Sequence, residues 1–319
     1  MVVALVAGAA ITEAQQRSKV PLIGAIAGPA SSVAPPYIEA GRRGLRELGY
    51  VEGQNIAIEY RFGGGRATAA ARLPVLAAEL VQLKVDVIVA VGDPAIYAAK
   101  QATTTIPIVM VAAGDPVAGG LVASLARPGG NITGTTFLSS ELAGKRLELL
   151  KEAASKGSRA VVLWNPKNPG GSLDLKETQA AAHAMGLTLQ VLEVRDPSEF
   201  DRAFSAMTKP ELLVVLTDPV TWSNRSEIVD LVAKHRLPAM YELREFVDAG
   251  GLMSYGPSLL NMVERAAFYV DKILKGAKPG DLPVERPTHF ELIMNLKAAK
   301  QIGLSIPPEL LTRANTVIK

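Results

Sequence analysis

The chain has 319 residues and a mass of 33.7 kDa, and its 48% hydrophobic content and mean hydropathy of +0.20 exclude a mainly disordered protein. Lys and Arg number 34 against 31 Asp and Glu, so the formal net charge is +3, and no basic cluster marks a dedicated nucleic-acid surface. Cysteine is absent, which excludes disulfides, thiolate metal sites and cysteine nucleophiles.

The N-terminal segment is apolar over residues 1–11, too short for the roughly 20 residues of a membrane-spanning helix. Thr12 and Ala14 resemble the small residues before a signal-peptidase site, although no Lys or Arg precedes Arg17, where a secretory signal normally has a positive start. We predict that residues 1–16 are the remnant of a secretory signal and that the protein is exported. An apolar N-terminal strand or tail is the alternative.

Short apolar runs follow from Val20 onward and alternate with amphipathic segments. The runs are rich in β-branched residues and lack polar alternation, which is typical of parallel strands covered on both faces. The sequence therefore predicts the α/β class. The expected strands are 22–27, 56–60, 85–91, 106–112, 160–164, 187–194, 212–216, 238–241 and 252–255.

The amphipathic segments have recognisable ends. One stops at Gly49, which suits the left-handed conformation after a helix, and another follows Ser139-Ser140. In Asp196-Pro197-Ser198-Glu199, a capping carboxylate precedes a first-turn proline and a glutamate that can reach back, so we expect a helix through Met207. The other expected helices include 38–48, 142–154 and 259–274.

Two breaker clusters divide the chain into lobes. The first is 126–131 (ARPGGN), followed by a polar stretch, and the second is 255–258 (YGPS). If the helix after the second cluster packs on the first lobe, the chain crosses more than once and creates a hinged cleft. We predict an N-terminal lobe of 17–135 plus about 258–285, and a C-terminal lobe of 136–257 plus about 286–319.

Three apolar runs end in the same dipeptide, Asp-Pro, and two Asn-Pro pairs follow a fourth. Asp or Asn before Pro is typical of the first turn of a helix, so we expect each pair to mark the carboxyl end of a strand that turns into a helix. The motifs are Gly92-Asp93-Pro94, Gly114-Asp115-Pro116, Thr217-Asp218-Pro219, Asn165-Pro166 and Asn168-Pro169.

These loops predict a ligand site in the cleft. In open α/β sheets, ligands bind outside the carboxyl ends of the strands, where helix N-termini offer free N–H groups and a partial positive charge. The N–H groups suit a carboxylate, and Asp93, Asp115 or Asp218 could pair with an ammonium group, so the combination favours an amino acid or a similar zwitterion. Each Asp has a second interpretation, because an N-cap Asp stabilises its helix by roughly 1 kcal/mol without any ligand.

Ser31 and Ser32, in the turn after the first strand, are either turn residues or ligand hydroxyls.

Aromatic side chains near strand ends are further candidates. In a cleft they would supply a stacking surface for an apolar or aromatic ligand group, and core packing is the alternative role of each. We favour Tyr241 and Tyr255, at the ends of second-lobe strands. The full set is Tyr37, Tyr97, Trp222, Tyr241, Phe246 and Tyr255.

Catalytic signatures are weak, and the sequence predicts neither a metal nor a cofactor. His183, His235 and His289 lack metal-ligand spacing, and we expect the first two to face solvent on helices. The sequence has no nucleophile elbow, Walker loop or dinucleotide-binding glycine motif. We interpret one helical segment as a solvated face with i,i+4 pairs, made of Glu141, Lys145, Arg146 and Glu148.

Four longer segments are more specific: 44–55 (GLRELGYVEGQN), 129–134 (GGNITG), 144–152 (GKRLELLKE) and 250–256 (GGLMSYG). In this order they resemble the ABC-transporter substrate-binding proteins, in the family that includes the tryptophan- and tyrosine-type binding proteins. The resemblance covers the chain from about Val20 to its end.

The resemblance implies a type I periplasmic binding fold, with two Rossmann-like lobes and three crossings, which closes on a ligand and delivers it to a membrane permease. It also implies a monomer and, because lipid-anchored members need a cysteine, a free periplasmic protein. Many relatives carry Gly-Thr where this chain has Gly92-Asp93, and the new carboxylate favours a cationic ligand group. By position, the cleft loops of the family fall on Ser31, Ser32, Gly92, Asp93, Gly114, Asp115, Asn165, Asn168, Asp218 and the segment 241–246.

The leading hypothesis is a solute receptor for a small amino-acid-like or aromatic carboxylate ligand. The alternative is a two-lobed α/β enzyme that acts on a nucleotide or sugar, with Asp115 or Asp218 as acid or base, but the sequence lacks the metal or cofactor signature that such an enzyme usually has. The ligand-sensing half of a regulator is a third hypothesis, disfavoured because no helix-turn-helix candidate precedes Val20.

Overall fold

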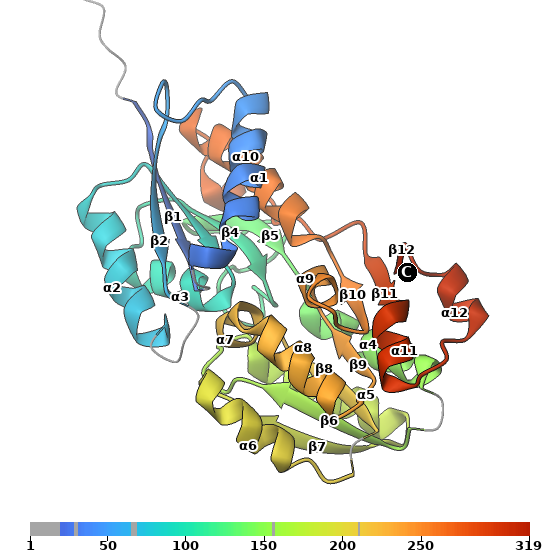
Figure 1. The fold of residues 1–319 in the computed structure, drawn as a ribbon. Helices are drawn as coiled ribbons and strands as arrows, with labels where there is room; N and C mark the ends of the chain where they lie inside the picture. The colour runs from blue at the N-terminus through green and yellow to red at the C-terminus, as the bar shows by residue number, and fades with distance from the viewer. Residues whose placement is uncertain (1–19, 29–30, 65–68, 155–156, 210) are drawn as a thin grey trace, which may run out of the picture.

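The computed structural model describes residues 20–28, 31–64, 69–154, 157–209 and 211–319. Within these residues, two sheets of mostly parallel strands follow one another along the chain, and helices flank both of them (Figure 1). This arrangement confirms the predicted α/β class. The predicted signal segment, residues 1–16, lies outside the described residues.

The first sheet consists of β1 (Leu22–Ala27), β2 (Ala57–Phe62), β3 (Val87–Val91), β4 (Ile108–Ala113) and β5 (Ile132–Thr136). The strands are parallel and lie in the order β2-β1-β3-β4-β5. Helices α2 (Ala69–Gln82) and α3 (Asp93–Ala102) pack on one face, and α1 (Pro35–Glu47) and α10 (Leu259–Leu274) pack on the other. A short 3-10 turn, η1 (Ser31–Val33), precedes α1.

The second sheet consists of β6 (Arg159–Trp164), β7 (Thr188–Glu193), β8 (Leu212–Val215), β9 (Ala239–Tyr241), β10 (Met253–Gly256), β11 (Glu291–Asn295) and β12 (Thr316–Ile318). The order is β12-β11-β10-β9-β8-β6-β7, and the pair β10–β11 is antiparallel. The helices of this part are α4 (Ser139–Ala153), α5 (Gly171–Ala184), α6 (Phe200–Ser205), α7 (Pro219–Ser223), α8 (Arg225–Lys234), α9 (Arg244–Asp248), α11 (Leu296–Ile302) and α12 (Pro308–Thr312), with the 3-10 turn η2 (Pro197–Glu199). A third 3-10 turn, η3 (Pro279–Asp281), follows α10 and lies beside β5 of the first sheet.

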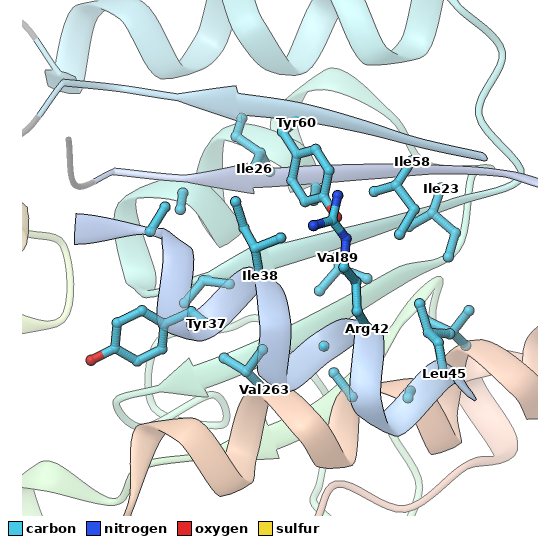
Figure 2. A pocket seen from close by; sticks show the side chains of 18 of the residues that line it. Ile23, Ile26, Tyr37, Ile38, Arg42, Leu45, Ile58, Tyr60, Val89 and Val263 are labelled. Atoms are coloured by element: carbon cyan, nitrogen blue, oxygen red, sulfur yellow. The ribbon is translucent and has the colours of Figure 1, made fainter. Parts of the chain in front are cut away.

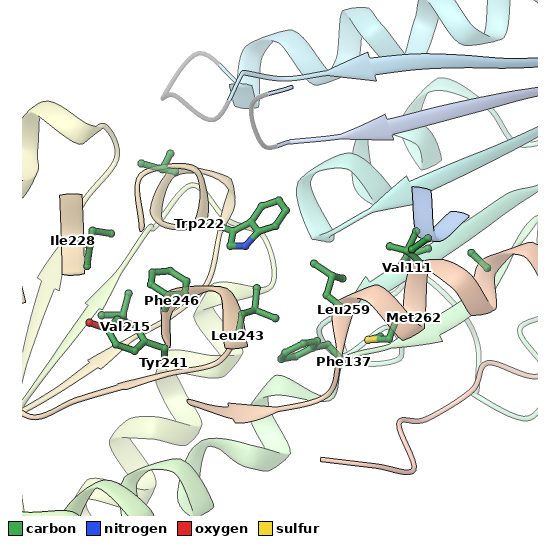
Figure 3. Packing of buried hydrophobic residues seen from close by; sticks show 14 of the residues in the cluster. Val111, Phe137, Val215, Trp222, Ile228, Tyr241, Leu243, Phe246, Leu259 and Met262 are labelled. Carbon is green, nitrogen blue, oxygen red and sulfur yellow. The ribbon is translucent and has the colours of Figure 1, made fainter. Parts of the chain in front are cut away.

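The chain passes between the two sheets after β5, after β10 and again before β11. Helix α10 lies beside α1 on the first sheet although it follows β10 of the second sheet (Figure 1). One hydrophobic cluster extends through both parts, because Phe137, Trp222, Leu259 and Met262 continue the packing from one sheet to the other (Figure 3). The exact lobe boundaries at 135/136, 257/258 and 285/286 stay a prediction.

The sequence patterns missed β5, β11 and β12. Strand β5 has a polar sequence, yet all its residues are buried. Two of its threonine hydroxyls donate to backbone carbonyl groups. Thr136 Oγ1 lies 2.9 Å from the carbonyl oxygen of Ala113, and Thr133 Oγ1 lies 2.7 Å from that of Leu282. A buried hydroxyl with a partner avoids the cost of desolvation, so a polar strand can occupy the core.

Two helix predictions need correction. The expected helix after Asp196 begins as the 3-10 turn η2 and continues as α6 only to Ser205, although the Asp196 carboxylate caps it by accepting from the N–H of Ser198 at 3.1 Å. No helix follows Asp115-Pro116, where the Asp115 carboxylate caps a turn by accepting from the N–H groups of Val117 and Ala118.

The contact between α1 and α10 depends on a glycine. A Cβ at Gly44 would lie 2.5 Å from the backbone oxygen of Glu264, whereas a Cβ at Gly41, one turn earlier, would lie 3.6 Å from Val263 Cγ1. We predict that Gly44→Ala lowers the free energy of unfolding by roughly 1–3 kcal/mol, because the two helices must separate. Gly41→Ala, the matched control, should raise it by about 0.5–1 kcal/mol through helix propensity. Equal effects of the two substitutions in urea denaturation would contradict this packing.

Candidate functional site

A cleft with a cavity of about 100 Å³ lies between the two parts of the molecule, at the carboxyl ends of their parallel strands. Its wall combines loops that follow β3, β4, β5, β8 and β9 with the starts of α5 and α10. It is lined by Val91, Gly92, Asp93, Pro94, Ala112, Gly114, Phe137, Ser139, Asp174, Thr217, Asp218, Pro219, Trp222, Glu242, Leu243 and Leu259. The cleft therefore lies at the carboxyl ends of strands and at helix starts, which is where ligands bind in open α/β sheets.

Asp93 is a cleft residue and not the N-cap that the Asp-Pro pattern predicted. It is the first residue of α3, whose N-cap is Gly92 at φ +78°, and the cap position makes no side-chain hydrogen bond. The Asp93 carboxylate instead accepts from the N–H of Gly114 at 3.0 Å through Oδ1. Burial, together with the nearby charge of Glu242, raises the pKa of Asp93 to about 6.

Asp218 behaves as a helix cap. Its Oδ1 accepts from the N–H of Thr221 at 2.8 Å, and the Thr221 hydroxyl accepts from the N–H of Asp218, which completes a capping box. Its Oδ2 accepts from the amide of Asn165. Burial raises the pKa of Asp218, and these hydrogen bonds oppose that shift. Both oxygens are engaged, so of the two functions weighed from the sequence, capping accounts for the observed contacts.

A buried ion pair forms the floor of the cleft. Arg146, interpreted from the sequence as part of a solvated face, has a side chain only 2% exposed, and its Nη1 lies 2.8 Å from Glu242 Oε1. The same Nη1 donates to the carbonyl and hydroxyl oxygens of Ser139, and the Ser139 hydroxyl also contacts Glu242. Glu242 Oε2 accepts from the N–H of Thr217 at 2.8 Å. The sequence pattern of α4 did not reveal that Arg146 is buried. Its neighbour Lys145 does face solvent and pairs with Glu148, as expected for a solvated face.

The cleft carries an excess of negative charge. Four carboxyl groups line it, and Arg146 pairs with one of them, Glu242. Burial and the charge of Glu242 raise the pKa of Asp174 well above its usual range, although Arg146 opposes that shift. Clustered carboxylates with one counter-charge favour either protonation or a bound cation. The four are Asp93, Asp174, Asp218 and Glu242.

Other predicted site residues lie around the cleft without lining it. Ser31 and Ser32 are exposed in η1, and Asp115 sits in the turn after β4. Asn165 supports Asp218, and Asn168 donates to the carbonyl oxygen of Thr217 at 3.5 Å. The Asn-Pro pairs do not cap α5 directly, because its N-cap is Gly170.

The favoured aromatic candidates, Tyr241 and Tyr255, do not line the cleft. Tyr241 and Phe246 are fully buried, and their rings stack with centroids 4.7 Å apart, behind Trp222 and Leu243 (Figure 3). Tyr255 is partly buried and packs beside Phe290, and its carbonyl oxygen accepts a hydrogen bond from Arg146 Nε. Side chains at a strand end point into the core when that face of the sheet is covered. The sequence alone does not determine which face is covered.

The aromatic residues that do line the cleft are Trp222, which the sequence pattern included, and Phe137, which it missed. Phe137 follows the polar strand β5, so no apolar run marked it. Two buried polar atoms on the cleft wall have no protein partner: the Trp222 indole N–H and the Thr217 hydroxyl. Such atoms are ready to bond to a ligand or to water.

The two parts of the molecule touch across the cleft. The Tyr37 hydroxyl on α1 lies 2.5 Å from Glu245 Oε1 on α9, and the Tyr37 and Trp222 rings meet edge to face at 5.1 Å. Gly170 approaches Asp93 so closely that a Cβ would overlap its carboxylate. These contacts describe a closed arrangement.

The described residues contain no group of three or more side chains placed to hold a metal ion. None of the described helices is both long and apolar enough to cross a membrane. His183 and His235 are exposed, as predicted from their helices.

Comparisons with known proteins place these features in a family context. Residues 19–318 match the model of the ABC transporter substrate binding protein family. A curated relative, the tyrosine-binding protein of Clostridioides difficile (strain R20291), is 28% identical over 85% of this chain and 79% of its own length.

Two solved structures share the fold closely. A conserved domain protein from Vibrio cholerae has a TM-score of 0.88 at 27% identity, covering 94% of this chain and all of that one. An ABC domain from Streptococcus pneumonia in complex with L-Trp has a TM-score of 0.85 at 25% identity, covering 93% of this chain and 99% of that one. Together they support the two-lobed type I periplasmic binding fold.

An open relative matches the chain less closely. A ligand-free, open substrate binding protein with adhesive properties from Clostridium difficile has the same 25% identity and covers 94% of this chain and 99% of its own, but its TM-score is 0.67. At equal identity, the lower score accords with lobes that are farther apart.

Closure can be tested at Gly170. We predict that Gly170→Ala weakens ligand binding tenfold or more, because its Cβ meets Asp93 only when the lobes close, while the melting temperature of the ligand-free protein stays unchanged. Gly171→Ala is the matched control, since its Cβ would meet neighbours no nearer than 3.5 Å. Calorimetric titration of both variants with the amino acid that binds best to the parent protein measures the effect. Equal affinities for the two variants would show that this contact does not form on closure.

Proposed function

Because the chain belongs to the ABC transporter substrate binding protein family, we propose that it is the extracytoplasmic receptor of an ABC importer and binds a small amino-acid-like ligand in the cleft. The alternative of an enzyme that acts on a nucleotide or sugar is not favoured. The single observation that carries the ligand class is the set of carboxyl groups in the cleft: four line it, three of them are buried, and Arg146 pairs with one of the four, Glu242.

The carboxyl groups of the cleft favour a ligand that carries a positively charged group. Asp93 is the best partner for an ammonium group, since Gly114 engages only its Oδ1 and no basic side chain pairs with it among the described residues. Charge-assisted hydrogen bonds are stronger than neutral ones, and more so in a site that excludes water. The pKa of about 6 leaves Asp93 ionised at neutral pH, as an ammonium partner requires.

Donors for a ligand carboxylate are also present. The N-termini of α3, α4 and α5 point toward the cleft, and their free N–H groups and dipoles suit an anion. The unpartnered Thr217 hydroxyl and Trp222 indole N–H add two side-chain donors. Opposite charges at two places in one cleft favour a zwitterion over a simple amine.

The remaining wall is apolar and aromatic. Phe137, Trp222, Leu243 and Leu259 surround the polar groups (Figure 3). An aromatic or aliphatic side chain would bury its surface against them. The tyrosine-binding relative and the L-Trp complex support the same ligand class, without fixing which amino acid this chain binds.

Delivery to a membrane permease follows from the closing movement. A ligand shifts the open–closed equilibrium only by its differential affinity for the closed state, and the closed form presents both lobes together to a permease. As further parts of this proposal, the protein is exported, free in the periplasm and monomeric, and its partners are the permease subunits. These features rest on the family and on the N-terminal sequence pattern.

The role of Asp93 gives a pH prediction. Binding of an amino acid should weaken as the pH falls from 7.5 to 5, because protonation of Asp93 removes the negative charge that the ammonium group needs. Below pH 6, this group alone contributes up to about tenfold loss per pH unit. Asp93→Asn should lower affinity at pH 7.5 by roughly ten- to a hundredfold and flatten the profile. Calorimetric titration with L-tyrosine and L-tryptophan across this range is the measurement.

Asp115→Asn is the control. Asp115 begins the same Asp-Pro dipeptide after the neighbouring strand β4, but it does not line the cleft. The side-chain oxygen of an asparagine can still accept from the N–H groups of Val117 and Ala118. Its affinity and pH profile should match those of the parent protein. An unchanged profile in Asp93→Asn would assign the ammonium partner to another group.

A further inference from the structure

A second cavity, of about 120 Å³, lies inside the first lobe between its sheet and the helices α1 and α10. Strands β1, β2 and β3 form one wall, and the two helices form the other (Figure 2). We call it the helix chamber. The helix chamber is partly open at the sheet edge, where Ile58, Tyr60 and Phe62 of β2 line it and are only partly buried.

The helix chamber is almost entirely apolar. Arg42 is the charged side chain on its wall among the described residues, and its Nε is paired with Glu52 Oε2 at 2.5 Å. Small residues on every wall create the space, and Val89 and Val91 on the central strand β3 are only partly buried. The small residues are Ala25, Ala27, Ala34, Gly41, Ala266 and Ala267. An apolar cavity of about 150 Å³ in another protein stays dry and binds benzene.

The helix chamber adjoins the cleft. Val91, Trp222 and Leu259 line both cavities, so these side chains lie between them. From there, the chamber-lining residues of α10 continue to Val270, which corresponds to about 16 Å along the helix axis. At the other end, Arg42 lies over the Tyr60 ring, 5.9 Å from its centroid (Figure 2). The cleft, with its polar groups, and the apolar helix chamber therefore lie next to each other, separated by the side chains of Val91, Trp222 and Leu259.

We propose that the helix chamber holds the apolar tail of the ligand, so that the substrate class is an amino acid with an elongated hydrocarbon side chain. The head group occupies the carboxylate-lined cleft, and the tail passes Trp222 and Leu259 into the first lobe. This inference rests on the proposed function, because the cleft must first bind the amino-acid head. It goes beyond it by assigning a site inside the lobe.

A series of straight-chain amino acids tests the tail site. L-norleucine, L-2-aminooctanoic acid and L-2-aminodecanoic acid share one head group and differ only in tail length. Burial of one methylene in an apolar environment strengthens binding about fourfold. Calorimetric affinities should therefore rise by roughly this factor per methylene until the chamber is full.

Two variants narrow the chamber from opposite walls. Ala25→Leu adds bulk from β1, and Gly41→Leu adds it from α1, where a Cβ has room beside Val263. Neither residue lines the cleft. Each variant should weaken binding of L-2-aminodecanoic acid at least tenfold and change that of L-norleucine by less than about twofold. Thermal melting shows whether each variant folds. If one of the two does not fold, the other is used for the test.

The outcomes separate this inference from the proposed function. Rising affinity that both folded variants abolish supports the tail site. If short amino acids bind but longer tails bind no better, or the variants leave the long-tail affinity unchanged, the inference is wrong and the receptor proposal stands. If no amino acid of any length binds to the parent protein, the proposed function fails, and the inference fails with it.

Discussion

The burial of like charges where two lobes meet is the constraint on which the rest of the site depends. Asp93 comes from the first lobe, while Asp174, Asp218 and Glu242 come from the second, and closure brings all four into one small cleft. The Arg146–Glu242 pair offsets part of this charge, and the Asp218 cap and its Asn165 contact stabilise another part. Asp93 is left with one backbone hydrogen bond. A buried carboxylate without a cation is unfavourable, so a cationic ligand would stabilise the closed form directly.

Close backbone approach makes this closure geometrically possible. Gly170 lies against Asp93, and Gly28 lies against Pro219, so each lobe offers a glycine where the other presents a loop. The Tyr37–Glu245 hydrogen bond and the Tyr37–Trp222 ring contact add a second zone of contact beside the cleft. Trp222 connects these features, because it touches the opposite lobe, lines the cleft and borders the helix chamber. Ligand recognition and lobe contact thus share the same side chain.

Sequence patterns predicted the fold and the place of the site better than its individual residues. The apolar runs located most strands, and the Asp-Pro motifs located the loops of the cleft, because parallel strands and helix starts have local signatures. Asp93 and Asp218 share the same dipeptide and both line the cleft, yet Asp93 accepts from the backbone of another loop, whereas Asp218 caps its own helix. Local sequence cannot distinguish them, because the difference lies in contacts with Gly114 and Asn165 from distant segments. Arg146 and the ring pair of Tyr241 and Phe246 were misplaced for the same reason: side-chain burial depends on tertiary packing.

Identification of the molecule that the protein carries tests the central claim most directly. The purified protein would be denatured, the released small molecules analysed by mass spectrometry, and the candidates rebound to fresh protein. The account predicts a stoichiometric ligand with an amino group and an apolar or aromatic side chain, which rebinds and is recovered unchanged. A bound anion without a positively charged group, or a nucleotide or sugar that the protein converts to product, would contradict it.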